Sequence, residues 1–199
     1  MTTSKREKMC LSGASFEIYV KERILSSACA KTIVKENYEF YSPDLGRGRE
    51  TDLIVIKPQA VYCIECKNYK SRNPRKHSFI KGNEYDLEWQ FASSGFLGYV
   101  ENPYMLNKRR IRCIQGSLRQ LDYPVLDIKN IVVVPDQCKV VSDCKSVMNL
   151  TTLQTLLSLE DSQKRSTISE KNKYHIIPRD IGVDITSKIL DTISYKVRY

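Results

Sequence analysis

Two neighbouring runs decide the fold of this chain: Glu50-Thr-Asp-Leu-Ile-Val-Ile56 and Val61-Tyr-Cys-Ile-Glu-Cys-Lys-Asn-Tyr69. Both runs are mostly apolar, as in strands that are buried on both of their faces. They are separated by Pro58-Gln-Ala60, a connection of the length found in hairpins. We therefore predict a hairpin of two strands, over residues 51–57 and 61–68.

Glu65 and Lys67 break the apolar pattern at the end of the second run. They are separated by one residue, so both side chains leave the same face of a strand. Asp52 opens the first strand, and an in-register hairpin places it opposite the end of the second strand. The pattern predicts that these three side chains lie together.

This set of side chains suits a particular chemistry. Two carboxylates at one point raise each other's pKa unless a cation lies between them, and Mg²⁺ prefers a few carboxylates together with water. Such a metal polarises a phosphoryl oxygen and lowers the pKa of a bound water. A lysine can orient that water or offset charge in the transition state. Asp52, Glu65 and Lys67 therefore point to phosphodiester hydrolysis, and the alternative is a solvated sheet edge.

The rest of the chain mixes helical and strand patterns. Helical periodicity predicts helices over residues 13–27, 103–121, 151–159 and 181–195. Apolar runs predict strands over 38–42 and 128–135, with another short strand within 138–150. Glycine, proline and charge predict a loop over 44–50, a loop or short hairpin over 70–83, and a polar excursion over 158–173. The pattern of residues 86–99 favours neither helix nor strand.

Composition places the chain among ordinary globular proteins. It has 199 residues, of which 41% are hydrophobic and 28% charged. No run is long and apolar enough to span a membrane, and the polar N-terminus has no signal-peptide core. Seven cysteines, an odd count, favour reduced thiols. A strand directs Cys63 and Cys66 to opposite faces, so the two could not easily share a metal. Both are therefore interpreted as packing residues. We expect a cytoplasmic protein without membrane association.

The charge of the chain is strongly basic. Lysine and arginine total 32 against 23 acidic residues, which gives +9 at pH 7. Such a surplus favours polyanions, and nucleic acid is the commonest of these partners. A merely soluble basic protein is the alternative that charge alone leaves open.

These motifs resemble those of a known family. Asp52, 13 positions before Glu65-Cys-Lys67, resembles the D-(x)n-E-x-K core of the PD-(D/E)xK nuclease superfamily. More narrowly, the two strand runs look like the NERD (nuclease-related) domain. Trp89 and then Asn102-Pro-Tyr-Met-Leu-Asn107 follow in the order of that family, and Glu17 matches a glutamate of its early helix. The resemblance covers roughly residues 12 to 135.

Two positions depart from the family pattern. Ser71 stands where the family usually has a glycine, and Leu106 replaces the glutamine of the Asn-Pro helix. Gln115, further along the same helix, is a candidate to take the place of that glutamine.

The resemblance implies an α/β fold with a restriction-endonuclease-like core, a mixed central β-sheet of about four or five strands flanked by α-helices. We expect one domain over residues 1–199, in which 140–199 is a C-terminal addition of unknown role. It also implies hydrolysis of DNA with Mg²⁺ or Mn²⁺ as the cofactor. The expected catalytic residues are Asp52, Glu65, Lys67 and Glu17. The expected metal ligands are Asp52, Glu65, Glu17 and the carbonyl of Cys66.

Basic residues near the expected site are candidates for contact with nucleic acid. They are Lys70, Arg72, Arg75 and Lys76 in a loop, and Lys108, Arg112 and Arg119 on one face of the helix over 103–121, where the neutral Gln115 joins them. The alternative for such a helix face is simple solvation. Glu17 could equally pair with Lys21 at i+4, and Trp89 is expected in the core rather than as a stacking platform.

Two further classes of function stay open. Leu106 favours a catalytically weak or inactive nucleic-acid-binding module. A nuclease subunit active only with a helicase or ATPase partner is the other, and that ATPase would act in trans because the chain has no G-x-x-x-x-G-K-[ST] motif. DNA is favoured over RNA, and a homodimer is left open.

Overall fold

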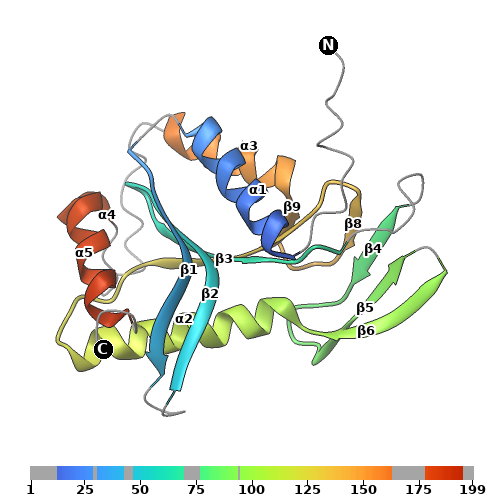
Figure 1. Cartoon of the computed structure of the whole chain (residues 1–199), viewed down its shortest axis with the longest axis horizontal. Coiled ribbons are helices and arrows are strands. Elements are labelled where there is room, and N and C mark those ends of the chain that lie inside the picture. The colour runs from blue at the N-terminus through green and yellow to red at the C-terminus, as the bar shows by residue number, and fades with distance from the viewer. Residues whose placement is uncertain are drawn as a thin grey trace.

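The computed structural model describes residues 13–28, 31–42, 47–69, 77–93, 95–162 and 178–194. These ranges form two β-sheets, and the helices pack mainly around the five-stranded one (Figure 1). The five-stranded sheet has the order β1-β2-β3-β7-β9, and the four-stranded sheet has the order β6-β5-β4-β8. The strands are β1 (Ile33–Ser42), β2 (Arg47–Ile56), β3 (Val61–Cys66), β4 (Ser78–Lys81), β5 (Glu88–Ser93), β6 (Phe96–Glu101), β7 (Ile128–Val134), β8 (Cys138–Val141) and β9 (Val147–Asn149). The helices are α1 (Gly13–Ser27), α2 (Pro103–Gln120), α3 (Leu150–Ser162), α4 (Pro178–Ile181) and α5 (Val183–Ile193).

The hairpin of β2 and β3 lies in the middle of the five-stranded sheet. Leu53 pairs with Ile64 and Ile56 with Val61, in antiparallel register. On the far side of β3, β7 pairs in parallel, and β9 pairs in parallel with β7. All six residues of β3 are buried, as its apolar run predicts. The predicted hairpin and the mixed sheet flanked by helices are confirmed.

The side chains of β3 alternate between two apolar cores. Tyr62, Ile64 and Cys66 pack on the face covered by α1 and α3. Val61 and Cys63 pack on the opposite face, which α2 and α5 cover. Cys63 and Cys66 therefore lie in different cores, and both are free thiols. Their interpretation as packing residues is confirmed.

The four-stranded sheet encloses a third core around Trp89, which is fully buried. Its indole Nε1 donates to the carbonyl oxygen of Asn83 at 2.9 Å. Gly82 is required beside it, because a Cβ there would lie 2.3 Å from Cγ of Trp89. The prediction that Trp89 is a core residue is confirmed.

This second sheet is the part of the fold that the sequence pattern predicts least well. Residues 86–99, without a clear preference in sequence, contain most of the β5–β6 hairpin. The predicted loop or short hairpin over 70–83 contains β4, which pairs with β5 and β8. Residues 70–76 lie outside the described ranges.

Several boundaries also differ from the prediction. The helices predicted over 13–27, 103–121, 151–159 and 181–195 correspond to α1, α2, α3 and α5. β2, however, begins at Arg47, inside the predicted loop over 44–50, because Arg47 to Glu50 pair with the end of β1. That pairing extends the sheet across a glycine-containing segment of low strand propensity. α3 continues to Ser162, into the predicted polar excursion, and residues 163–177 lie outside the described ranges.

The segment after residue 140 takes part in the same cores. Leu153 and Leu157 of α3 pack on the α1 face of the sheet, and Leu190 and Ile193 of α5 pack on the α2 face. The buried ammonium of Lys57 also donates to the carbonyl oxygen of Leu157 at 2.8 Å. Across the described ranges, no helix is both long enough and apolar enough to cross a membrane.

Candidate active site

Asp52 lies where the backbone pairing of β2 with β3 ends. The paired residues stop at Leu53 and Ile64. One step further, the backbone N–H of Cys66 donates to Oδ2 of Asp52 at 2.6 Å. A carboxylate thus replaces the backbone acceptor of a regular antiparallel pair, and this bond fixes Asp52 at the end of β3.

The strands β1 and β2 are distorted at the same level. Asn37 has a φ of 46°, in the left-handed region that asparagine tolerates. Leu53 packs on the α1 face, yet Thr51, two residues away, contacts the thiol of Cys63 at 3.2 Å on the α2 face. Residues two apart share a face in a regular strand, so β2 changes face at Asp52. Asp52 thus lies at the position where the side chains of β2 change face.

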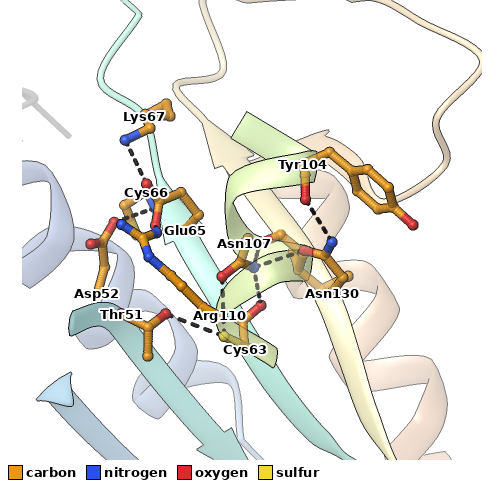
Figure 2. Close-up of polar contacts among 11 residues, drawn as sticks. Thr51, Asp52, Cys63, Glu65, Cys66, Lys67, Tyr104, Asn107, Arg110 and Asn130 are labelled. Atoms are coloured by element: carbon orange, nitrogen blue, oxygen red, sulfur yellow. Dashed lines mark hydrogen bonds and ion pairs between the residues drawn. The ribbon is translucent and has the colours of Figure 1, made fainter. Parts of the chain in front are cut away.

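Glu65 is buried and meets two cations. Nζ of Lys67 lies 2.5 Å from Oε1, and Nη1 of Arg110, from helix α2, donates to Oε2. Figure 2 shows Lys67 and Arg110 reaching this carboxylate at the end of β3, with Asp52 beside them. The predicted grouping of Asp52, Glu65 and Lys67 is therefore what the hairpin produces.

Two carboxyl groups around this point, those of Asp52 and Glu17, have a raised pKa. Burial and then the charge of Glu65 raise the pKa of Asp52 to about 6, and the N–H of Cys66 partly offsets this. Burial, Glu50 and Glu65 likewise raise the pKa of Glu17, on α1. The charges of neighbouring carboxylates therefore add to the effect of burial at both groups.

Glu17 is free of the alternative partner that its sequence position offers. Lys21, one turn along α1, donates instead to Glu36 on β1 at 2.7 Å. The half-buried carboxyl of Glu17 is electrostatically coupled to Asp52 and Glu65, which suits the expectation that it assists them.

The donor set fits a hard divalent cation. Oxygen atoms of Asp52, Glu65 and Glu17 are the ligands that Mg²⁺ and Mn²⁺ prefer. Burial and then the charge of Glu65 raise the pKa of Asp52, and a cation between the two carboxylates would offset their repulsion. The thiol of Cys66 is buried in the α1-side core, so Cys66 has only its backbone to offer. In the conformation of the described residues, no three His, Cys, Asp or Glu side chains already surround a metal position.

Two asparagines fix helix α2 against this site. Asn102 caps the helix by accepting from the N–H of Met105 at 3.1 Å, and Pro103 occupies the first turn. Nδ2 of Asn102 donates to three carbonyl oxygens of the loop before β5, those of Asn83, Glu84 and Asp86. The Asn-Pro pair of the motif thus joins α2 to the second sheet.

Asn107, in the first half of α2, anchors the helix to β3 and β7. Its Nδ2 donates to the carbonyl oxygen of Cys63 at 2.8 Å and to Oδ1 of Asn130 at 2.7 Å, while Cys63 Sγ donates to its Oδ1 (Figure 2). Arg110 comes three residues later, on the same side of the helix. Our sequence interpretation missed Arg110; its spacing from Asn107, a polar residue on the buried side of α2, is the signal that could have found it.

The predicted nucleic-acid contacts on α2 lie away from this centre. Lys108 pairs with Glu84 at 3.0 Å, and Arg112 and Arg119 are exposed. Gln115 donates to the carbonyl oxygen of Leu126 at 3.4 Å. Gln115 lies two turns beyond Asn107, and the hypothesis that it replaces the missing glutamine stays a prediction.

The other predicted contacts, Lys70, Arg72, Arg75 and Lys76, lie outside the described residues. The structure therefore leaves that part of the predicted interface as a prediction.

A mixed sheet flanked by helices, with two carboxylates and a lysine at the end of its central hairpin, defines a domain of the nuclease-like α/β class. The chain belongs to the nuclease-related domain (NERD) family, whose family model matches residues 12–135. The matched range contains Glu17, the β2–β3 hairpin and all of α2. No curated protein and no solved structure matches the chain.

Proposed function

We propose that this protein is a metal-dependent nuclease that hydrolyses phosphodiester bonds of DNA. The observation that supports it is the meeting of Asp52, Glu65 and Lys67 at the end of the β2–β3 pairing. When bound, Mg²⁺ or Mn²⁺ supplies a Lewis acid for the phosphoryl oxygen and lowers the pKa of a bound water.

Each residue has a role that its position suggests. Asp52, fixed by Cys66, and the buried Glu65 would hold the cation, and the carbonyl of Cys66 would be a further ligand. Glu17 adds a carboxyl from α1. Lys67 is 31% exposed, so its ammonium can face both water and substrate, orienting the water and offsetting charge at the phosphorus.

The basic surplus of the chain supports an anionic polymer as substrate. A net charge of +9 attracts the phosphate backbone and releases its counterions. The proposed contacts are Lys70, Arg72, Arg75, Lys76, Lys108, Arg112, Gln115 and Arg119.

Cleavage of supercoiled plasmid and of labelled single strands, in Mg²⁺, Mn²⁺ or EDTA, tests the proposal. We expect metal-dependent cutting that Lys67→Ala and Asp52→Ala both lose. Lys129→Ala is a matched control, because Lys129 pairs with Asp127 at the surface of β7. Cutting that survives both active-site substitutions, in proteins that melt like wild type, would refute the site.

A second candidate function is a nucleic-acid-binding module that does not cleave. Leu106, half-buried on α2, favours it because the family pattern has glutamine there. Such a module would tolerate chelation and Lys67→Ala, and would bind DNA with a strong dependence on salt. A gain of cutting in Leu106→Gln would identify the substitution as the cause of the lost activity.

A third proposal is that the protein cleaves nucleic acid only together with a partner. A homodimer would place two sites for cleavage of both strands, and an ATPase or helicase in trans would supply single strands. Cutting that appears only when such a partner is added would separate this case from a module that only binds.

A further inference from the structure

Arg110 shares the buried carboxylate of Glu65 with Lys67. Lys67 lies 2.5 Å from Oε1, and Arg110 donates to Oε2, so a protein cation meets each oxygen. Glu65 is only 1% exposed. In this conformation, the proposed metal would therefore compete with Arg110 for Oε2, while Oε1 has the ammonium of Lys67 beside it but makes no hydrogen bond within the described part of the chain.

The two protein cations and a divalent metal cannot all stay at Glu65. Positive charges a few ångströms apart repel strongly where water is largely excluded. Arginine keeps its proton in proteins, so Arg110 cannot relieve the repulsion by losing charge. Its side chain is 25% exposed, which gives the guanidinium a route away from Glu65.

The base of Arg110 is fixed, whereas its tip can change partner. Asn107, one turn earlier, is bonded to the carbonyl oxygen of Cys63 on β3 and to Asn130 on β7. Within the described ranges, Glu65 is the hydrogen-bond partner of the guanidinium. Rotation of the side chain therefore releases Glu65 without movement of α2.

We infer that Arg110 is a phosphate-binding residue of this site. When a divalent cation binds, the guanidinium of Arg110 moves from Glu65 to the scissile phosphate. The inference rests on the proposed function. A guanidinium can hold two oxygens of a phosphate through parallel N–H···O bonds. Because α2 holds Arg110 beside Glu65, the released guanidinium stays next to the carboxylates that would hold the cation.

The first test is the affinity for Mn²⁺ without DNA, measured by electron paramagnetic resonance. Arg110→Met removes the charge at similar length, and we expect it to bind Mn²⁺ about tenfold more tightly, the effect of losing one charge-assisted competitor. The control is Arg109→Met, because Arg109 is 60% exposed and pairs with Glu101; its Mn²⁺ affinity should equal that of wild type. An unchanged or weaker affinity in Arg110→Met overturns the inference.

The second test is the affinity for a single-stranded oligonucleotide in Ca²⁺, measured by fluorescence anisotropy. We expect Arg110→Met to bind about tenfold more weakly than Arg109→Met, through loss of one charge-assisted phosphate contact. Arg110→Lys keeps the charge but not the planar fork. It should restore wild-type Mn²⁺ affinity without restoring oligonucleotide affinity, and it carries the test if Arg110→Met does not fold. Equal oligonucleotide affinity in Arg110→Met and wild type overturns the inference.

The inference and the proposed function fail in different ways. A wild-type protein that binds no Mn²⁺ overturns both. Mn²⁺-dependent cutting that is lost in Asp52→Ala but kept in full by Arg110→Met and Arg110→Lys overturns only the role of Arg110.

Discussion

The backbone N–H of Cys66 donates a 2.6 Å hydrogen bond to the carboxylate of Asp52. The bond extends the β2–β3 pairing by one step, with a side chain as the acceptor. It fixes Asp52 close enough to Glu65 for their charges to interact, and burial together with that charge raises the pKa of Asp52 to about 6. The contact that positions the group therefore holds it where ionisation is unfavourable.

Asp52→Asn is expected to stabilise the metal-free protein at neutral and alkaline pH. The amide keeps an oxygen for the N–H of Cys66 and carries no charge. Because folding raises the pKa of Asp52 from 3.8 to about 6, ionisation favours the unfolded chain; the cost is full above the folded pKa and vanishes below the unfolded one. We expect a gain of about 2 kcal/mol at about pH 8 and little at about pH 4, from urea unfolding in EDTA. A gain independent of pH would show that the charge of Asp52 is not its source.

Binding of Mn²⁺ is expected to weaken as the pH falls through the pKa of Asp52. A protonated carboxyl is a poor ligand, so protons compete with the cation once the pH is below about 6. The affinity should fall about tenfold for each pH unit in that range, as measured by calorimetry. In Asp52→Asn the affinity should be low and much less dependent on pH. A steep pH dependence retained by that variant would assign the proton to another group.

Asn107→Ala is expected to destabilise the protein by about 2–4 kcal/mol. The substitution removes a buried amide and leaves the thiol of Cys63 and Oδ1 of Asn130 without this partner. Urea unfolding measures the change, and Gln115→Ala is the control, because Gln115 makes one long bond of 3.4 Å. Equal stability of the two variants would mean that Asn107 does not anchor α2.

Gly82→Ala is expected to cost roughly 1–3 kcal/mol, since the new methyl group would overlap the buried indole of Trp89. The fluorescence of Trp89, the single tryptophan, reports both the repacking and the unfolding. Gly116→Ala is the matched control, because its Cβ meets no atom within 4 Å. Alanine in α2 should raise the free energy of unfolding by roughly 0.5–1 kcal/mol. If Gly116→Ala destabilised the protein as much as Gly82→Ala, overlap with Trp89 would not be the cause of the effect at Gly82.

The hairpin of the site could be predicted from sequence because its information is local. Glu65 and Lys67 interrupt a buried strand at a spacing of two, and the short connection fixes which strand pairs with it. The helical period of α2 is likewise contained within its own 18 residues. These elements follow from periodicity and turn length alone.

The remaining features depend on contacts between distant residues. β4 pairs with β8, whose residues lie 60 positions further along the chain, and no local pattern in the four residues of β4 predicts that pairing. Arg110 looks like its neighbours Lys108 and Arg109 in sequence. Only the way Asn107 seats α2 on β3 and β7 turns it, and not them, toward Glu65.

The likeness to the nuclease-related family stops at residue 135, but the hydrophobic interior does not. Leu153 and Leu157 cover one face of the sheet, and Leu190 and Ile193 cover the other. A protein cut after residue 135 would expose part of each face to water, because α1 and α2 alone would cover them. We therefore expect residues 12–135, expressed alone, to aggregate rather than to form a smaller folded domain.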